Sequence, residues 1–174
     1  MTVVGLDVHA RSTHAAAIDL VTGELVRARF GPGVEAVIEW LASRRAPVRA
    51  VYEAGPTGFG LVRAAQAAGI DVSVCAPGKT PRASGDRVKT DRKDAELLAR
   101  LLLAGQLRPI TVPPDWLEAA RHLSRARESV RHDLARARHR VSKLLLVEGR
   151  VYGSPTTWNR AHRQWLGGCP IFCV

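Results

Sequence analysis

The first 76 residues show strand-like and helix-like patterns in an order that few folds accept. Residues 2–8, 13–20 and 25–30 are rich in β-branched and apolar residues, which is typical of strands. The tight-turn sequence Val21-Thr22-Gly23-Glu24 separates the last two of these segments. We therefore expect residues 2–30 to form a three-stranded antiparallel meander.

A strict alternation within residues 25–30 predicts which side chains share a face of this meander. Because successive side chains of a strand point to opposite faces, Leu25, Arg27 and Arg29 lie on one face. Val26, Ala28 and Phe30 then lie on the other.

Helical and strand-like segments alternate after the meander. We expect a helix over 33–44, a strand over 48–53, a helix over 58–68 and a strand over 70–76. Thr57 is a candidate N-cap for the second helix. Strand–helix–strand alternation implies parallel pairing, so the sequence predicts an α/β fold with a mixed sheet and flanking helices.

The second half has a different organisation. Residues 77–90 form a Pro-, Gly- and Lys/Arg-rich loop, and a helix is expected from about 90 to 104. After a proline-rich linker, Asp115 opens a long helix, and Glu118 three residues later resembles a capping box. Apolar residues at a spacing of three and four among many arginines are typical of a coiled-coil seam. We predict three parts: a domain over 1–112, a long basic helix over 113–150 and a C-terminal segment over 151–174.

Charge is distributed unevenly between the two halves. The net charge is +10, but residues 1–78 hold 7 Lys and Arg against 7 Asp and Glu. Residues 79–174 hold 19 against 9, so they carry the whole excess, mostly as arginine. Such a one-sided charge favours a nucleic acid partner. The alternative is a solvated basic surface without a specific partner.

Cysteine use and hydropathy bear on the compartment. The three cysteines, Cys75, Cys169 and Cys173, do not have the number or spacing of a disulfide framework. The sequence contains neither a signal-peptide pattern nor a long apolar segment, so we expect a cytoplasmic protein.

Four acidic residues have a placement that suggests chemistry. Asp7 and Glu53 lie at the ends of predicted strands, and Asp91 and Asp94 lie on the first turn of a predicted helix. Strand ends and helix starts meet at one edge of an α/β sheet, where sites form. Carboxylates gathered there repel one another unless cations neutralise them. Two Mg²⁺ or Mn²⁺ ions about 3.5–4 Å apart would do so and would assist phosphodiester displacement.

Each acid taken alone has a simpler explanation. Asp7 could end a strand, Glu53 could belong to a turn, and Asp91 and Asp94 could favour the helix dipole. Their joint placement favours a site. His9 lies two residues from Asp7 and is expected on the same face. His9 and His14 are five residues apart and are not expected to form a metal-binding pair.

Basic residues surround the last two acids and continue into the long helix. The segment Lys89-Thr90-Asp91-Arg92-Lys93-Asp94 interleaves acids and bases, so it could hold metal and phosphate together. The expected nucleic-acid contacts are Lys79, Arg82, Arg87, Lys89, Arg92, Lys93, Arg131 and Arg138.

Three motifs carry a resemblance to a known family. They are Gly-Leu-Asp-Val-His at 5–9, Tyr-Glu-Ala-Gly-Pro-Thr-Gly at 52–58 and Lys-Thr-Asp-Arg-Lys-Asp-Ala at 89–95. Over residues 2–166 the chain resembles the DEDD transposases of the insertion sequence 110 family, which are related to the Piv-type DNA invertases. The resemblance implies a ribonuclease H-like (RuvC-like) fold and a catalytic, metal-binding tetrad of Asp7, Glu53, Asp91 and Asp94. It also implies DNA as substrate, a structured guide RNA, and a homodimer or higher oligomer formed through the long helix.

The sequence departs from the family pattern at its end. Members of the family continue into a second domain that carries a nucleophilic serine, whereas residues 169–174 look like out-of-frame translation or a gene fragment. We therefore expect that this chain alone does not complete strand exchange. Two alternatives are a stand-alone nuclease of the Holliday-junction type and a non-catalytic, nucleic-acid-binding remnant.

Overall fold

The computed structural model describes residues 1–77 and 91–169, except for the side chains of Asp91 and Arg92. The chain divides into two compact units, residues 1–112 and 113–174.

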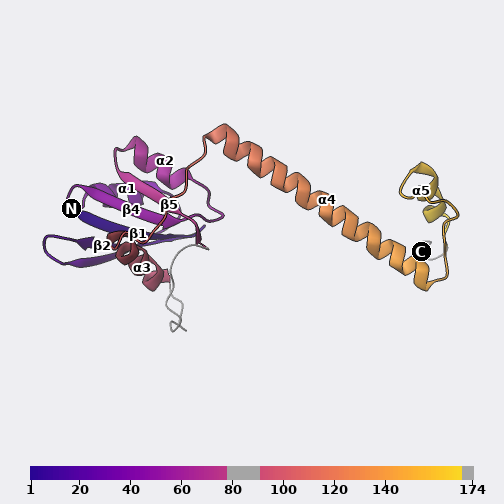
Figure 1. The fold of residues 1–174 in the computed structure, drawn as a ribbon, viewed down its shortest axis with the longest axis horizontal. Helices are drawn as coiled ribbons and strands as arrows, with labels where there is room; N and C mark the ends of the chain where they lie inside the picture. The colour runs from indigo at the N-terminus through magenta and orange to yellow at the C-terminus, as the bar shows by residue number, and fades with distance from the viewer. Residues whose placement is uncertain (78–90, 170–174) are drawn as a thin grey trace. The chain divides into compact units, whose positions relative to one another are not determined.

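A five-stranded mixed sheet forms the centre of the first unit (Figure 1). Its strands are β1 (Thr2–Val8), β2 (Thr13–Asp19), β3 (Leu25–Phe30), β4 (Val48–Glu53) and β5 (Asp71–Cys75). They are ordered β3-β2-β1-β4-β5, with the first three antiparallel and both β1–β4 and β4–β5 parallel. The predicted meander and the parallel additions to it are therefore confirmed.

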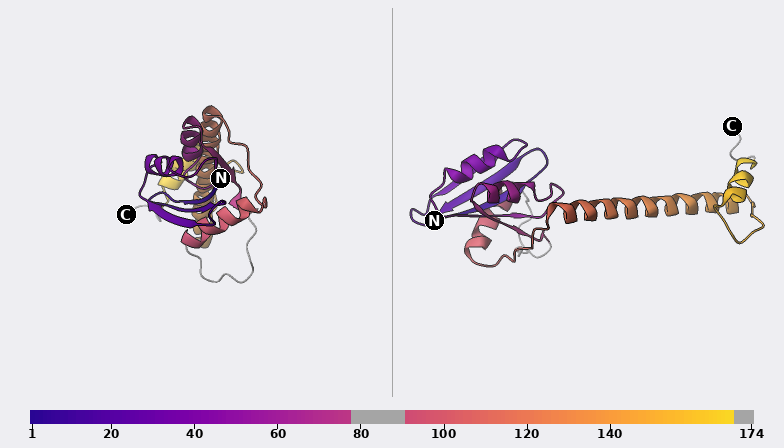
Figure 2. Two further views of the ribbon diagram at one scale, coloured as in Figure 1. Left: turned by 90° about the vertical axis from the view of Figure 1, so that its left-hand side faces the viewer. Right: turned by 90° about the horizontal axis from the view of Figure 1, so that it is seen from above.

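Helices cover both faces of this sheet (Figure 2). Helices α1 (Glu35–Ala42) and α2 (Gly60–Ala67) lie on one face, and α3 (Asp91–Leu103) lies on the other. The mixed sheet between these helices confirms the predicted ribonuclease H-like fold.

Alternation along the strands assigns side chains to the two faces. Leu6 of β1 and Tyr52 of β4 are fully buried in the main core, together with Leu41 of α1 and Val62 of α2. Ala28 and Phe30 of β3 pack against this core, as the alternation in residues 25–30 predicted. Residues at the intervening positions, such as Val51, lie on the opposite face, where Leu98 of α3 covers them. Each fully buried Leu or Val contributes about 1.5–3 kcal/mol to stability, so the fold holds these strands firmly.

Gly5 of β1 brings α3 unusually close to the sheet. A Cβ atom placed on Gly5 would lie 2.1 Å from the Ala95 carbonyl oxygen and 2.4 Å from the Ala99 nitrogen. Only a residue without a side chain fits there, so the backbones of β1 and α3 are in direct contact. This contact fixes the position of α3 along β1.

Two predicted helix caps are wrong. Helix α2 begins at Gly60 and has Phe59 at its N-cap position without a side-chain hydrogen bond. The preceding turn continues past Thr57, because Gly58 adopts a φ of 70° and its N–H donates to the Gly55 carbonyl at 3.3 Å. The long helix, α4 (Asp115–Val147), has Pro114 at its N-cap position, so Asp115 and Glu118 lie inside its first turn. There both carboxylates favour the helix dipole instead of forming a capping box.

The second unit consists of α4, a connecting segment and α5 (Arg160–Gly167). The 33 residues of α4 extend about 50 Å at 1.5 Å per residue. The Arg138 guanidinium of α4 lies over the Trp158 ring ahead of α5, and Leu145 near the end of α4 and His162 of α5 are buried. His162 lies in an aromatic cluster with Tyr152, Trp158 and Trp165.

No helix in the described part of the chain has both the length and the apolar character that a membrane-spanning segment needs.

Candidate active site and nucleic-acid interface

Asp7 and Glu53 lie at matching positions on neighbouring strands. The parallel register pairs Leu6 of β1 with Tyr52 of β4, so one residue further along Asp7 stands beside Glu53 at the carboxyl ends of both strands. Neighbouring strands are about 4.8 Å apart. Because Leu6 and Tyr52 point into the main core, Asp7 and Glu53 belong to the opposite face, which α3 covers.

The first turn of α3 carries the other two predicted acids. Asp94 directly precedes Ala95, whose carbonyl oxygen contacts β1 at Gly5, two residues before Asp7. Asp94 is partly buried, and the side chain of Asp91 lies outside the description. Among the side chains that are described, no three of His, Cys, Asp or Glu gather closely enough to hold a metal ion. The four-carboxylate site therefore stays a prediction.

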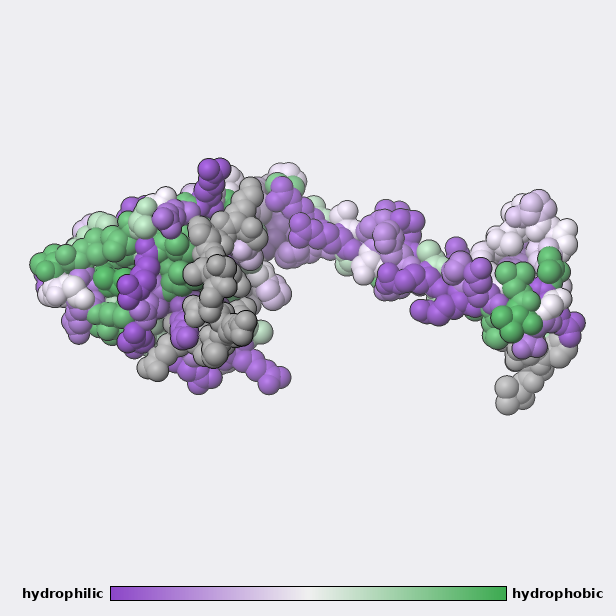
Figure 3. Space-filling model, turned by 60° about the horizontal axis from the view of Figure 1, so that its bottom comes forward, coloured by the Kyte–Doolittle hydropathy of each residue, from purple (hydrophilic) through white to green (hydrophobic). Residues whose placement is uncertain are grey.

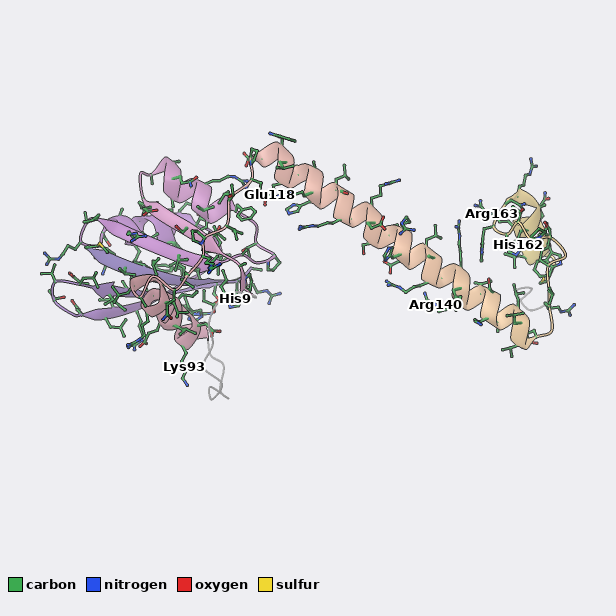
Figure 4. The ribbon with its side chains drawn as sticks, viewed as in Figure 1. His9, Lys93, Glu118, Arg140, His162 and Arg163 are labelled. Carbon is green, nitrogen blue, oxygen red and sulfur yellow. The ribbon has the colours of Figure 1, made fainter. Side chains whose placement is uncertain are left out.

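His9 contacts the carboxylate of Asp7 directly. Its Nε2 atom lies 2.9 Å from Asp7 Oδ2, and because an ionised carboxylate can only accept, Nε2 donates this bond. The Asp7 side chain is 19% exposed and that of His9 is 49% exposed, so the imidazole is the more solvent-accessible partner of this pair. Figure 4 shows His9 just beyond the sheet and Lys93 at the start of α3. His9 thus lies beside Asp7, as its spacing predicted.

His14 is a neighbour of Asp7 that the sequence analysis missed. The antiparallel register pairs Asp7 with His14 of β2, and His14 with Arg29 of β3. Directly paired residues share a face, so these three side chains form one row with Glu53. The short connection between β1 and β2, closed by the His9 N–H and the Ser12 carbonyl at 2.9 Å, could have revealed this pairing.

Glu96 of α3 connects the helix to the edge strand β3. Its carboxylate accepts hydrogen bonds from Arg100 of α3 and from Arg27 of β3, both at 2.7 Å. The Arg100 guanidinium, followed by that of Arg27, holds the pKa of Glu96 below its ordinary value. Together with the Gly5 contact, this ion pair fixes α3 on the face that carries the acids.

The predicted phosphate-contacting residues lie in both units, and several of them fall outside the described residues. Lys79, Arg82, Arg87 and Lys89 lie outside the described residues, as does the side chain of Arg92. Lys93 is exposed on the first turn of α3. In the second unit, Arg131 of α4 pairs with Glu128 at 2.6 Å, and the Arg138 guanidinium lies 5.3 Å from the centre of the Trp158 ring. Their contacts with nucleic acid remain predictions.

Comparison with known proteins identifies close relatives. The family model for transposases of the DEDD, insertion sequence 110 type matches residues 4–147. The proposed transposase y4qE of Sinorhizobium fredii (strain NBRC 101917 / NGR234) is 42% identical over 134 residues, which is 77% of this chain and 34% of that protein. The transposase for insertion sequence element IS1533 of Leptospira borgpetersenii is 34% identical over 170 residues, covering 94% of this chain and 49% of the relative.

The matches cover most of this chain but only part of each relative, so they bear on the family of the chain and not on the activity of the whole relatives. The chain spans between about a third and a half of the length of these relatives. The family model, by contrast, covers most of the chain and all three motifs in which the resemblance was found. The chain therefore belongs to the DEDD transposases of the insertion sequence 110 family.

Proposed function

We propose that residues 1–112 are the metal-dependent, phosphodiester-cleaving part of a DNA transposase. The observation that carries this proposal is the placement of Asp7 and Glu53 side by side at the ends of parallel strands, on the face covered by α3. Asp91 and Asp94 begin that helix. Four carboxylates from three elements provide the hard oxygen ligands that Mg²⁺ and Mn²⁺ prefer.

The four acids would hold two divalent ions. When bound, such ions supply charge neutralisation and activate oxygen for an in-line displacement at phosphorus. The residues of the chain would position this chemistry. His9 holds the Asp7 carboxylate in one orientation through its 2.9 Å hydrogen bond, and Gly5 keeps the start of α3 against β1. Lys93, with the predicted basic residues of 79–92, would hold the DNA strand.

Substitution of the acids tests the proposal. We expect Asp7→Asn and Glu53→Gln each to lower Mg²⁺-dependent cleavage of DNA by about 100-fold or more, because each removes a metal ligand. The full chain is assayed on single-stranded and four-way-junction DNA, and Mn²⁺ binding is followed separately by electron paramagnetic resonance. Glu24→Gln, in the exposed β2–β3 turn, is the matched control.

The outcomes also separate the other functions. Unchanged cleavage and Mn²⁺ binding in both acid variants would overturn the proposal. Preferential cutting of junctions by the wild-type chain would support a structure-specific nuclease. Nucleic-acid binding that persists in Asp7→Asn, without any cutting by the wild type, would support a binding remnant.

We further propose that α4 joins copies of the chain and contacts nucleic acid. Trp116, Leu123 and Val130 recur at intervals of seven, and they are 71%, 74% and 67% exposed. Ala137 and Leu144 continue the same series. An exposed apolar stripe with this period is typical of a coiled coil, whose partner helix covers it. On the face of α4 that Figure 3 shows, most side chains are hydrophilic.

Analytical ultracentrifugation tests the association. We expect Val130→Glu to convert the oligomer to a monomer, because it places charges in the proposed seam. Ala135→Glu adds the same charge to α4 away from this stripe and should leave the oligomer intact. A wild-type chain that sediments as a monomer at all concentrations would rule the coiled coil out.

The proposed partners of the basic residues are DNA and a structured guide RNA. The excess positive charge of residues 79–174 supports both, because arginine forks match phosphate oxygens. The slope of affinity against salt concentration would count the phosphates contacted on each nucleic acid.

A further inference from the structure

A hollow on the first unit lies next to the proposed acidic site. It has a volume of about 330 Å³ and is lined by residues of β2 and β3, namely His14, Ala15, Arg27, Ala28 and Arg29. Ala15 and Ala28 have their side chains toward the main core, so they contribute backbone to the hollow. The polar groups that line it come from the histidine and the two arginines.

These three polar side chains lie on the same face of the sheet as Asp7. Arg27 reaches Glu96 of α3, which shows that it points to the face covered by that helix. Arg29 is two residues further along β3 and therefore points the same way. The row Arg29–His14–Asp7 crosses three neighbouring strands, so the Arg29 backbone is about 10 Å from that of Asp7.

The two arginines differ in whether a carboxylate already engages the guanidinium, and therefore in whether it can bind a phosphate. Arg27 is held in an ion pair with Glu96, which also pairs with Arg100, so its guanidinium is already engaged. Arg29 is exposed, and within the described residues no carboxylate pairs with it. Beside it, His14 adds a ring that can donate or accept a hydrogen bond. An exposed guanidinium that no described carboxylate balances matches, in a solvent-open hollow, the two oxygens of a phosphate group.

We propose that this hollow binds a backbone phosphate of the DNA strand, close to the phosphate that lies over Asp7 and Glu53. The position of the strand rests on the proposed function, whereas recognition of the phosphate rests on the Arg29 guanidinium. The hollow holds the strand on the side of β3, and the acids act on it at the ends of β1 and β4. Arg29 would be a positioning residue for cleavage.

Binding measurements without metal test this proposal separately from catalysis. The full chain in EDTA, at slightly alkaline pH, is titrated with fluorescently labelled single-stranded and branched DNA over a series of KCl concentrations. We expect Arg29→Gln to weaken binding by about 3- to 10-fold and to lower the salt slope by about 0.7–0.9, the contribution of one phosphate. Arg29→Lys keeps the charge but loses the fork, so its slope should match the wild type while its affinity falls.

Arg49 provides a matched control on the same sheet. It lies on the same face as Val51 and Glu53 but at the opposite end of β4, where it pairs with Asp71 at 3.5 Å. Arg49→Gln should therefore leave both affinity and slope unchanged. Circular dichroism of each variant verifies that it is folded.

Each outcome decides the proposal. An Arg29→Gln variant that binds DNA like the wild type would overturn the proposal. An equal loss of affinity in Arg49→Gln would also overturn it, because the effect would then come from the overall positive charge and not from the hollow. If Asp7→Asn cleaves DNA like the wild type while Arg29→Gln lowers the salt dependence of DNA binding, phosphate binding in the hollow is supported and the proposed function is wrong.

Discussion

Gly5 determines how closely α3 can lie on β1, and it is therefore the residue where a small substitution should have a large effect. An added Cβ would overlap the backbone of Ala95 and Ala99, which cannot move without shifting the whole helix. We expect Gly5→Ala to lower the free energy of unfolding by about 1–3 kcal/mol or more. Urea denaturation monitored by circular dichroism measures this change.

Gly60→Ala is the control for this substitution. A Cβ at Gly60, the first residue of α2, would meet no atom within 4 Å. Alanine there should leave stability unchanged or raise it by about 0.4–1 kcal/mol, because it restricts the unfolded chain. Equal effects of the two substitutions would mean that the Gly5 contact is absent in solution.

Glu96 gives the first unit a predictable pH dependence. Its pKa is lowered by Arg100 and then by Arg27, so its stabilising contribution is complete above the ordinary pKa of 4.5 and is lost as the pH falls through the lower folded value. We expect Glu96→Gln to lower the free energy of unfolding at neutral pH by about 0.5–1 kcal/mol. The difference from the wild type should shrink below about pH 4.5, whereas a constant difference would contradict this role.

At the level of residues, the sequence could predict which side chains are candidates for the site better than it could predict which side chains surround them in space. Asp7 and Glu53 were predicted to lie close together because both end strands, and the parallel register places them at neighbouring positions. His14 was missed because its proximity to Asp7 depends on where the hairpin between β1 and β2 turns. The gathering of Asp91 and Asp94 with the other two acids remains a prediction.

The long helix α4 illustrates what a single element needs for stability. Leu145 near its end is its one buried residue, and most of its apolar side chains are exposed. Helices depend mainly on packing of an apolar face, although the Glu128–Arg131 and Asp133–Arg136 pairs add support. We expect the helical content of the chain, measured by far-ultraviolet circular dichroism, to rise with protein concentration.

The same experiment with Val130→Glu provides the comparison. This variant should lose the concentration dependence, whereas Ala135→Glu should retain it. Helical content that is independent of concentration in the wild type would show that α4 is stable without a partner.

At the level of elements, the positions of strands and helices were predictable, including the start of α4 at Asp115, but the helix caps were not. The strands at 2–8, 25–30 and 48–53 have the predicted bounds, because alternation and β-branched residues act locally. The start of α2 depends on the conformation of Gly58, and the cap of α4 falls on Pro114 instead of Asp115, which the local pattern did not specify.

For the whole molecule, the core indicates that the first unit can fold independently. Both hydrophobic clusters of the described residues use side chains from residues 3–112 only. We expect a fragment of residues 1–112 to unfold cooperatively, with a melting temperature within a few degrees of the corresponding transition in the full chain. Differential scanning calorimetry compares the two. A fragment without a cooperative transition would show that the sheet needs the second unit.

The overall architecture was predictable because strand–helix–strand alternation leaves few topologies. The close contact of α3 with β1 was not predictable, since it depends on one glycine meeting a helix more than 85 residues later. Sequence patterns report on neighbours within an element, whereas such contacts arise only when the elements pack.

Both edge strands of the sheet, β5 and β3, are protected from pairing with other molecules, and this protection favours solubility. The segment after α3 covers β5, since Ile110 donates to the Val74 carbonyl at 2.8 Å and Pro109 bridges to Cys75. Proline offers no N–H, so an additional strand cannot extend the ladder there. At the other edge, β3 carries Arg27 and Arg29. Their positive charges discourage a strand of another molecule from pairing with this edge. Aggregation by edge pairing is thus resisted at both margins, and neutralising the arginines would remove that protection on one of them.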